Sequence, residues 1–156
     1  MKVVKKLRRE DGAAAVEFAL IVGVLAMLIF GMLQFGLAFF ELQNLRAATR
    51  EGARYGSVQG SVAEIQNKVE TYSGVTGLGS SVVVRTRTGN TLSAPVTSTA
   101  TKPCAPATGN APDSVQASVP ISGAPQSVRE IFSIDVPLLP TMVLTPTISG
   151  EFRCES

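Results

Sequence analysis

The chain lacks histidine, and its other polar residues form no recognisable catalytic motif. Histidine is the commonest general base and metal ligand at neutral pH, so its absence removes much of the usual catalytic chemistry. The sequence also has no glycine-rich phosphate loop and no nucleophile elbow around a serine. Two isolated cysteines are a poor ligand set for zinc. We therefore predict that the protein is not an enzyme and holds no metal or cofactor.

Charge is small in sum and uneven in distribution. The chain carries +2 overall, but residues 1–12 contain five basic and two acidic side chains, and the remainder has a net charge of −1. A nucleic-acid-binding protein would gather its basic residues on the folded domain. The distribution predicts no nucleic-acid partner.

One apolar stretch, residues 12–40, dominates the first third of the chain. Between residues 18 and 40 the only strongly polar side chain is Gln34. As a helix, this segment would be about 34 Å long, against a hydrocarbon core of about 30 Å. We predict a single membrane span with lipid as a partner. Basic residues before a first span favour a cytoplasmic N-terminus, which places the chain after about residue 41 outside.

Both cysteines, Cys104 and Cys154, fall in the part of the chain predicted to lie outside. An even number of cysteines in an oxidising compartment predicts a disulfide. Two separate buried thiols are the alternative.

The N-terminus has two interpretations. Its apolar run is too long for an ordinary cleaved secretory signal. It is either an uncleaved signal anchor or a segment cleaved on the cytoplasmic side, between Gly12 and Ala13.

Residues around Gly12 carry a resemblance to a known family. Basic residues, then Gly12, four small or apolar residues and Glu17-Phe18 resemble a type IV prepilin processing site. Residues 15–19 (AVEFA), 34–36 (QFG) and 50–55 (REGARY) are similar to the TadE-like domain of tight-adherence (Flp pilus) systems. This resemblance covers about residues 12–57, and TadF-like proteins share the architecture closely.

The resemblance implies a function. It describes a minor pilin or pseudopilin of the bacterial inner membrane that takes part in biogenesis or assembly of a Flp-type (Tad) pilus. Its partners would be a prepilin peptidase, other pilins or pseudopilins and the inner-membrane assembly platform. Glu17 and Phe18 would be recognised in processing or assembly. The alternative is an unprocessed, signal-anchored envelope protein whose outer domain binds or scaffolds another molecule.

Glu17 also stands out on physical grounds, because a carboxylate in an apolar membrane helix is costly. Cleavage before Ala13 would create an α-amino group four residues upstream, on the same helix face. This amine could neutralise Glu17 within one subunit or between neighbours. Alternatively, the side chain is tolerated at the membrane interface by snorkelling.

Two further faces are predicted on the same helix. The small residues Ala15, Ala19 and Gly23 repeat every four residues and form a face for helix packing. Beyond the span, apolar and small residues keep helical spacing to about residue 57. Another face there carries Arg46, Arg50 and Arg54, which either contact lipid or a partner or are simply solvated.

The rest of the chain predicts a small α+β domain. Ser61 and Glu64 form a capping-box pattern at the start of a helix over residues 61–73. Strands are expected at 81–88, 114–121 and 142–154, the last interrupted by Pro146, with a long loop over 93–112. Residues 124–141 are either an irregular hairpin or an apolar loop near the membrane.

These elements give a predicted architecture similar to a type IV pilin. A long N-terminal helix extends outward and meets a second short helix and a small antiparallel sheet. The expected divisions are a basic cytoplasmic leader (1–12), the transmembrane and extended helix (13–57) and an extracytoplasmic domain (58–156).

Overall fold

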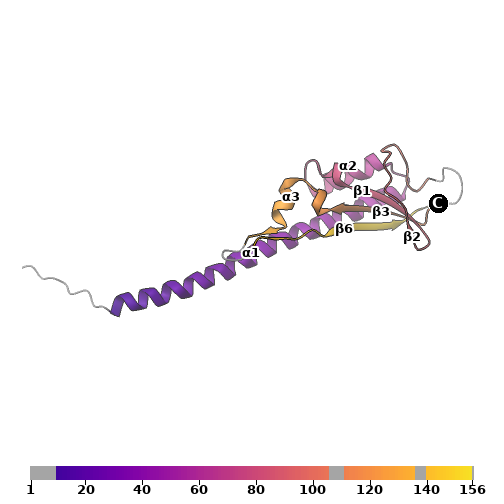
Figure 1. Cartoon of the computed structure of the whole chain (residues 1–156). Coiled ribbons are helices and arrows are strands. Elements are labelled where there is room, and N and C mark those ends of the chain that lie inside the picture. Colours follow the sequence, from indigo (N-terminus) through magenta and orange to yellow (C-terminus); the bar gives the residue numbers. More distant parts are fainter. Residues whose placement is uncertain (1–9, 106–110, 136–139, 156) are drawn as a thin grey trace, which may run out of the picture.

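The computed structural model describes residues 10–105, 111–135 and 140–155 (Figure 1). Most of the predicted leader, at 1–9, lies outside the described residues. So do parts of the predicted loop and hairpin, at 106–110 and 136–139.

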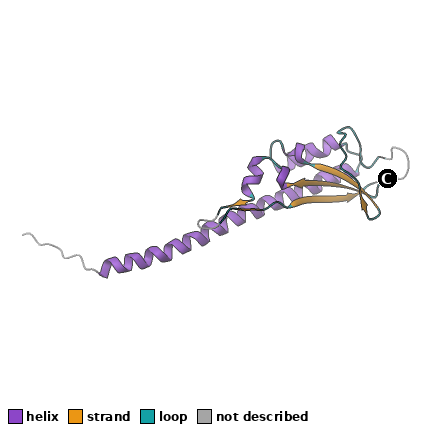
Figure 2. Ribbon diagram, viewed as in Figure 1, coloured by secondary structure: helices purple, strands orange, loops and turns teal. Residues whose placement is uncertain are grey.

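The longest element is helix α1, Glu10–Ser57, with 48 residues. At 1.5 Å per residue it is about 72 Å long. Its N-terminal half projects as a single helix, and its C-terminal half lies within the folded domain (Figure 2). The predicted extension of the apolar helix to about residue 57 is confirmed.

Helix α2, Val62–Ser73, begins at the predicted capping box. Ser61 N–H donates to Glu64 Oε2 at 2.8 Å, while Glu64 N–H donates to the Ser61 hydroxyl. These bonds satisfy backbone donors that a helix start otherwise leaves unpaired. The helix ends at Gly74, whose φ of 69° is left-handed and therefore suits glycine.

The domain contains a four-stranded antiparallel sheet in the order β2-β1-β3-β6. Its strands are β1 (Val83–Thr88), β2 (Thr91–Leu92), β3 (Ser114–Pro120) and β6 (Thr147–Arg153), and a short 3-10 helix, Leu78–Ser81, precedes β1. In the register, Ala117 of β3 lies between Val84 of β1 and Gly150 of β6. The predicted α+β class is confirmed.

The strand predicted over residues 142–154 is instead two strands. β5, Met142–Val143, ends before Pro146, and β6 begins after it at the edge of the sheet. Proline has no N–H for a ladder, which explains the break. The strand predicted to reach Ile121 ends at Pro120, and Ile121 begins a 3-10 helix, Ile121–Gly123.

Residues 124–135 and 140–143 contain elements that the sequence analysis did not place. A short helix, α3, covers Gln126–Ile131 after Pro125. β4, Ser133–Ile134, pairs antiparallel with β5. The described residues therefore support the hairpin alternative for this region.

The core lies between the sheet, α2 and the C-terminal half of α1. It includes Leu45, Ala48, Ile65, Val69, Val84, Val115, Ala117, Val119 and Ile148, each at most 3% exposed. Glycines allow this close approach: a Cβ on Gly56 would lie 2.6 Å from Ile65 Cδ1. A Cβ on Gly150 would lie 2.5 Å from the Arg50 backbone nitrogen, so β6 packs directly on the backbone of α1.

Candidate functional site

The N-terminal half of α1 exposes its large apolar side chains. Those between Val16 and Phe40 named here are each 43–73% exposed: Val16, Phe18, Leu20, Ile21, Val22, Val24, Leu25, Leu28, Ile29, Phe30, Met32, Leu33, Phe35, Leu37, Phe39 and Phe40. A helix this apolar in a soluble protein would be buried. Among the described helices, α1 is long and apolar enough to cross a membrane, and its most apolar window is unburied. The helix therefore indicates an N-terminal membrane anchor.

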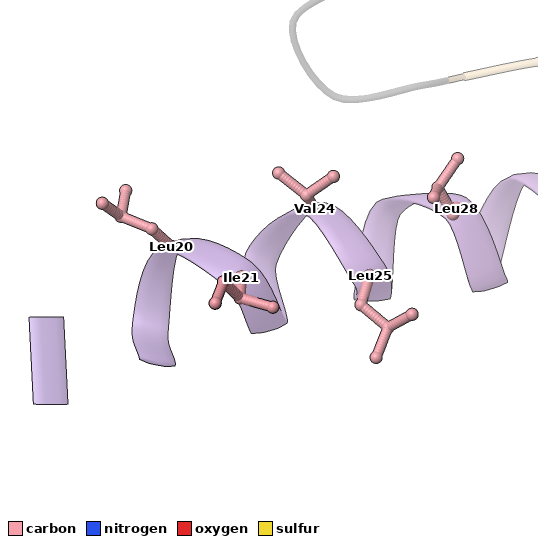
Figure 3. A pocket seen from close by; sticks show the side chains of 5 residues that line it. All are labelled: Leu20, Ile21, Val24, Leu25 and Leu28. Carbon is pink, nitrogen blue, oxygen red and sulfur yellow. The ribbon is translucent and has the colours of Figure 1, made fainter. Parts of the chain in front are cut away.

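The surface of this anchor is made of hydrocarbon. In Figure 3, Leu20, Val24 and Leu28 project from one side of the helix, while Ile21 and Leu25 project from another. The shallow groove between them offers no side-chain hydrogen-bonding group. Such a surface suits lipid tails or other apolar helices and gives no means of orienting a polar small molecule.

The predicted cleavage position lies at the beginning of this surface. Gly12 and Ala13 both belong to α1, and a Cβ on Gly12 would meet nothing within 4 Å. Glu17 and Phe18 are exposed, Phe18 by 68%. Ala13 and Glu17 are one turn apart on a common face. The structure thus places an accessible carboxylate one turn from the predicted new N-terminus.

The small residues Ala15, Ala19 and Gly23 are also exposed. Space beside Gly23 is open, since a Cβ there would meet nothing within 4 Å. No described element of this chain covers this face. Its role in packing another helix stays a prediction.

The arginine stripe, Arg46, Arg50 and Arg54, lies on the C-terminal half of α1, and all three side chains are exposed. Arg54 pairs with Glu51 on its own helix, with Nη2 2.8 Å from Glu51 Oε1. Within the described part of the chain, Arg46 and Arg50 have no ion-pair partner. These two are the members of the stripe that retain capacity for an external anion.

The two cysteines form a disulfide. Cys104 and Cys154 are bonded, with their Cα atoms 5.4 Å apart and a sequence separation of 50. The bond joins the loop before residue 106 to the chain just after β6. Disulfides are typical of oxidising compartments, which is consistent with a domain outside the cytoplasm.

Two carboxylates stabilise the domain, one through hydrogen bonds from backbone N–H groups and the other through an ion pair across the sheet. Glu70 accepts hydrogen bonds from the Gly77 and Gly79 N–H groups, both at 2.9 Å, and these bonds lower its pKa. Glu151 pairs with Arg87 across the sheet at 2.7 Å, and this arginine and Ser114 lower the pKa of Glu151. Their contacts lie within the domain, so we assign them to stability.

Sequence reasoning assigned no contact to two polar residues where α1 enters the domain. Gln34 Nε2 donates to the Asp135 backbone carbonyl at 3.2 Å, although these residues are 101 positions apart. Glu41 is only 9% exposed, and its Oε1 has no hydrogen-bond partner within the described structure. Their polarity near the end of an apolar run indicated a change of surroundings, but only the tertiary structure shows which residues they face.

Comparison with known proteins agrees with this arrangement. The family model described as TadE-like protein matches residues 12–54. Neither the curated proteins nor the solved structures contain a match. The matched segment begins at the predicted cleavage position, includes the exposed apolar surface and extends into the domain. This family is associated with Tad pilus systems. Over residues 12–54, which form most of α1, the chain is similar to TadE-like proteins.

Proposed function

We propose that this protein is a minor pilin or pseudopilin that takes part in assembly of a Flp-type (Tad) pilus. The observation that carries the proposal is α1 itself. One continuous helix has an uncovered apolar half and an outer half built into an α+β domain. A helix that is first held in lipid and later packed among other apolar helices needs such a surface.

The proposal includes processing between Gly12 and Ala13 by a prepilin peptidase. Glycine is about 1 kcal/mol less favourable than alanine within a helix, so Gly12 makes this point easier to open than alanine would. Cleavage would leave residues 13–57 as the assembly helix and 58–156 as the outer domain. Residues 1–12 would remain on the cytoplasmic side of the inner membrane.

In the processed protein, Glu17 is the proposed assembly contact. Its carboxylate is exposed on α1, so an amine from its own chain or from a neighbour can approach it. Neutralisation lowers the cost of holding a charge among apolar helices. The face formed by Ala15, Ala19 and Gly23 is proposed to receive a neighbouring pilin helix.

The processing step is tested by determining the N-terminus of the purified protein from cells with and without the prepilin peptidase. We expect a chain that starts at Ala13 with the enzyme and an intact leader without it. Gly12→Leu should keep the leader. Gly31→Leu, the same change at another open position of α1, should be processed normally. An intact leader in the presence of the peptidase would instead favour a permanently anchored envelope protein.

A further inference from the structure

The β4–β5 hairpin lies beside the apolar part of α1, away from the four-stranded sheet (Figure 1). Leu144 N–H donates to the Phe132 carbonyl at 2.9 Å and extends the pairing of Ser133–Ile134 with Met142–Val143. The hydrogen bond from Gln34 to the Asp135 carbonyl ties the same hairpin to α1. The hairpin is therefore held at a defined height along the helix.

One side of this region is buried and the other is apolar and open. Phe132 and Ile134 are 2% and 3% exposed. In contrast, Met142, Val143 and Leu144 are 59%, 61% and 39% exposed. Three consecutive apolar side chains thus face outward at the end of the domain nearest the membrane anchor.

Beside the hairpin, α1 likewise has one buried face and other faces that are exposed. On the face next to the hairpin, Ala38 is 5% exposed and Glu41 is 9% exposed. On the other faces at this height, Phe39 and Phe40 are 60% and 68% exposed. The exposed apolar surface of the anchor therefore continues past the hairpin, and the residues Met142, Val143 and Leu144 extend it sideways.

The height of the hairpin limits how far α1 can enter the membrane. Asp135 lies level with Gln34, which is about 9 Å below Phe40 along the helix axis. A two-stranded hairpin has unpaired backbone groups at its edges, and these are too costly for the hydrocarbon core. Residues 12–33 alone would span about 33 Å, which is sufficient for a core of about 30 Å. The hydrocarbon boundary thus falls near Gln34, below the end of the apolar run.

We propose that Met142, Val143 and Leu144 form a membrane foot that rests in the outer headgroup region of the bilayer and sets the depth of α1. This inference rests on the membrane-inserted state of the proposed function, but it does not depend on processing or on pilus assembly. The occupant is lipid, because the foot continues the apolar surface of the anchor at the height where the bilayer ends. Interfacial elements reach about 5–10 Å into this boundary, as the foot would.

The natural absence of tryptophan makes the foot directly testable. Single-tryptophan variants of the full chain are placed in nanodiscs that hold one copy each, with lipids brominated near the glycerol end of the acyl chain. Val143→Trp probes the foot. Tyr72→Trp is the matched control, because Tyr72 is 55% exposed but lies on α2. Met32→Trp, within the anchor, reports whether the chain is inserted.

We expect brominated lipid to quench Val143→Trp at least about twofold more strongly than Tyr72→Trp, because an interfacial side chain lies near the bromine atoms. With Met32→Trp quenched, equal quenching of Val143→Trp and Tyr72→Trp would overturn the foot. That result would favour a neighbouring subunit as the binding partner of Met142, Val143 and Leu144. A chain without leader cleavage but with a quenched Val143→Trp would contradict the processing proposal and support the foot.

A second variant tests whether the foot sets depth. Val143→Asp should move a tryptophan at Met32, inside the hydrocarbon, outward, seen as weaker quenching by deep bromines relative to shallow ones. Val58→Asp is the control, since Val58 is 52% exposed and directly follows the C-terminal end of α1. An unchanged depth profile for Met32→Trp in the Val143→Asp chain would show that the hairpin does not set the position of α1.

Discussion

At the scale of single residues, Glu17 is the proposed assembly contact. A membrane boundary near Gln34 places the other boundary near residue 14, because a core of about 30 Å spans about 20 helical residues, so Glu17 lies inside the hydrocarbon by about 4–5 Å. A carboxylate there needs a partner more strongly than one at the interface. The new α-amino group on Ala13 is the nearest candidate after cleavage.

We therefore predict that Glu17→Gln inserts and is processed but enters sheared pili in much smaller amounts, by about tenfold or more if one ion pair is lost. Immunoblots of membranes and of sheared pili measure both quantities. Glu17→Asp retains the charge and should be affected less. Incorporation of Glu17→Gln at the level of the unaltered protein would show that the carboxylate is not an assembly contact.

Gly52 has a structural role that its place in the family-like run 50–55 does not reveal. A Cβ at this position would collide with Val69 and approach the Ile65 carbonyl to 3.3 Å. We predict that Gly52→Ala destabilises the domain by about 1–3 kcal/mol, the usual cost of overpacking. Gly36→Ala, at an open position of the same helix, should be neutral or slightly stabilising. Urea unfolding of both variants in detergent provides the comparison, and equal midpoints would refute tight packing at Gly52.

At the scale of elements, helices α1 and α2 were predictable because their signals are local. The capping bonds of Ser61 and Glu64 involve residues three apart, and helical spacing alone extended α1 to Ser57. The β4–β5 hairpin was left undecided because its position depends on Gln34, far away in the chain. Helix α3 was missed because six residues show too little periodicity to identify a helix.

The turn between α2 and β1 depends on an ionised carboxylate. The hydrogen bonds from Gly77 and Gly79 lower the pKa of Glu70 below its ordinary value of 4.5. The folded state consequently binds fewer protons than the unfolded state, and this stabilisation is lost as pH falls toward the folded pKa. We predict that Glu70→Gln is less stable than the unaltered protein at neutral pH and loses less stability on acidification. Thermal unfolding at successive pH values tests this, and parallel curves for the two proteins would exclude the role.

At the scale of the whole molecule, the candidate site combines local and long-range features. Gly12, Glu17 and the exposed apolar surface all lie on one helix, so their positions follow directly from the sequence. The proposed membrane foot, Met142, Val143 and Leu144, belongs to a hairpin that a hydrogen bond joins to Gln34, and no local pattern connects these parts of the sequence. The limit on helix depth therefore emerged only from the packed structure.

The disulfide ties the C-terminal end of the α+β domain to the loop before residue 106 and so stabilises the fold of the whole domain. It closes a segment of 50 positions, for which the chain-entropy model gives a contribution on the order of 4 kcal/mol. We predict that Cys104→Ala with Cys154→Ala lowers the urea midpoint of the domain by an amount that approaches this value. The anchor should still insert, because its helix is apolar and has all its backbone bonds within itself. Adding a reductant to the unaltered protein should give the same shift and leave the double variant unchanged. A midpoint that responds to neither change would mean that the sheet and helices alone hold the C-terminal strand in place.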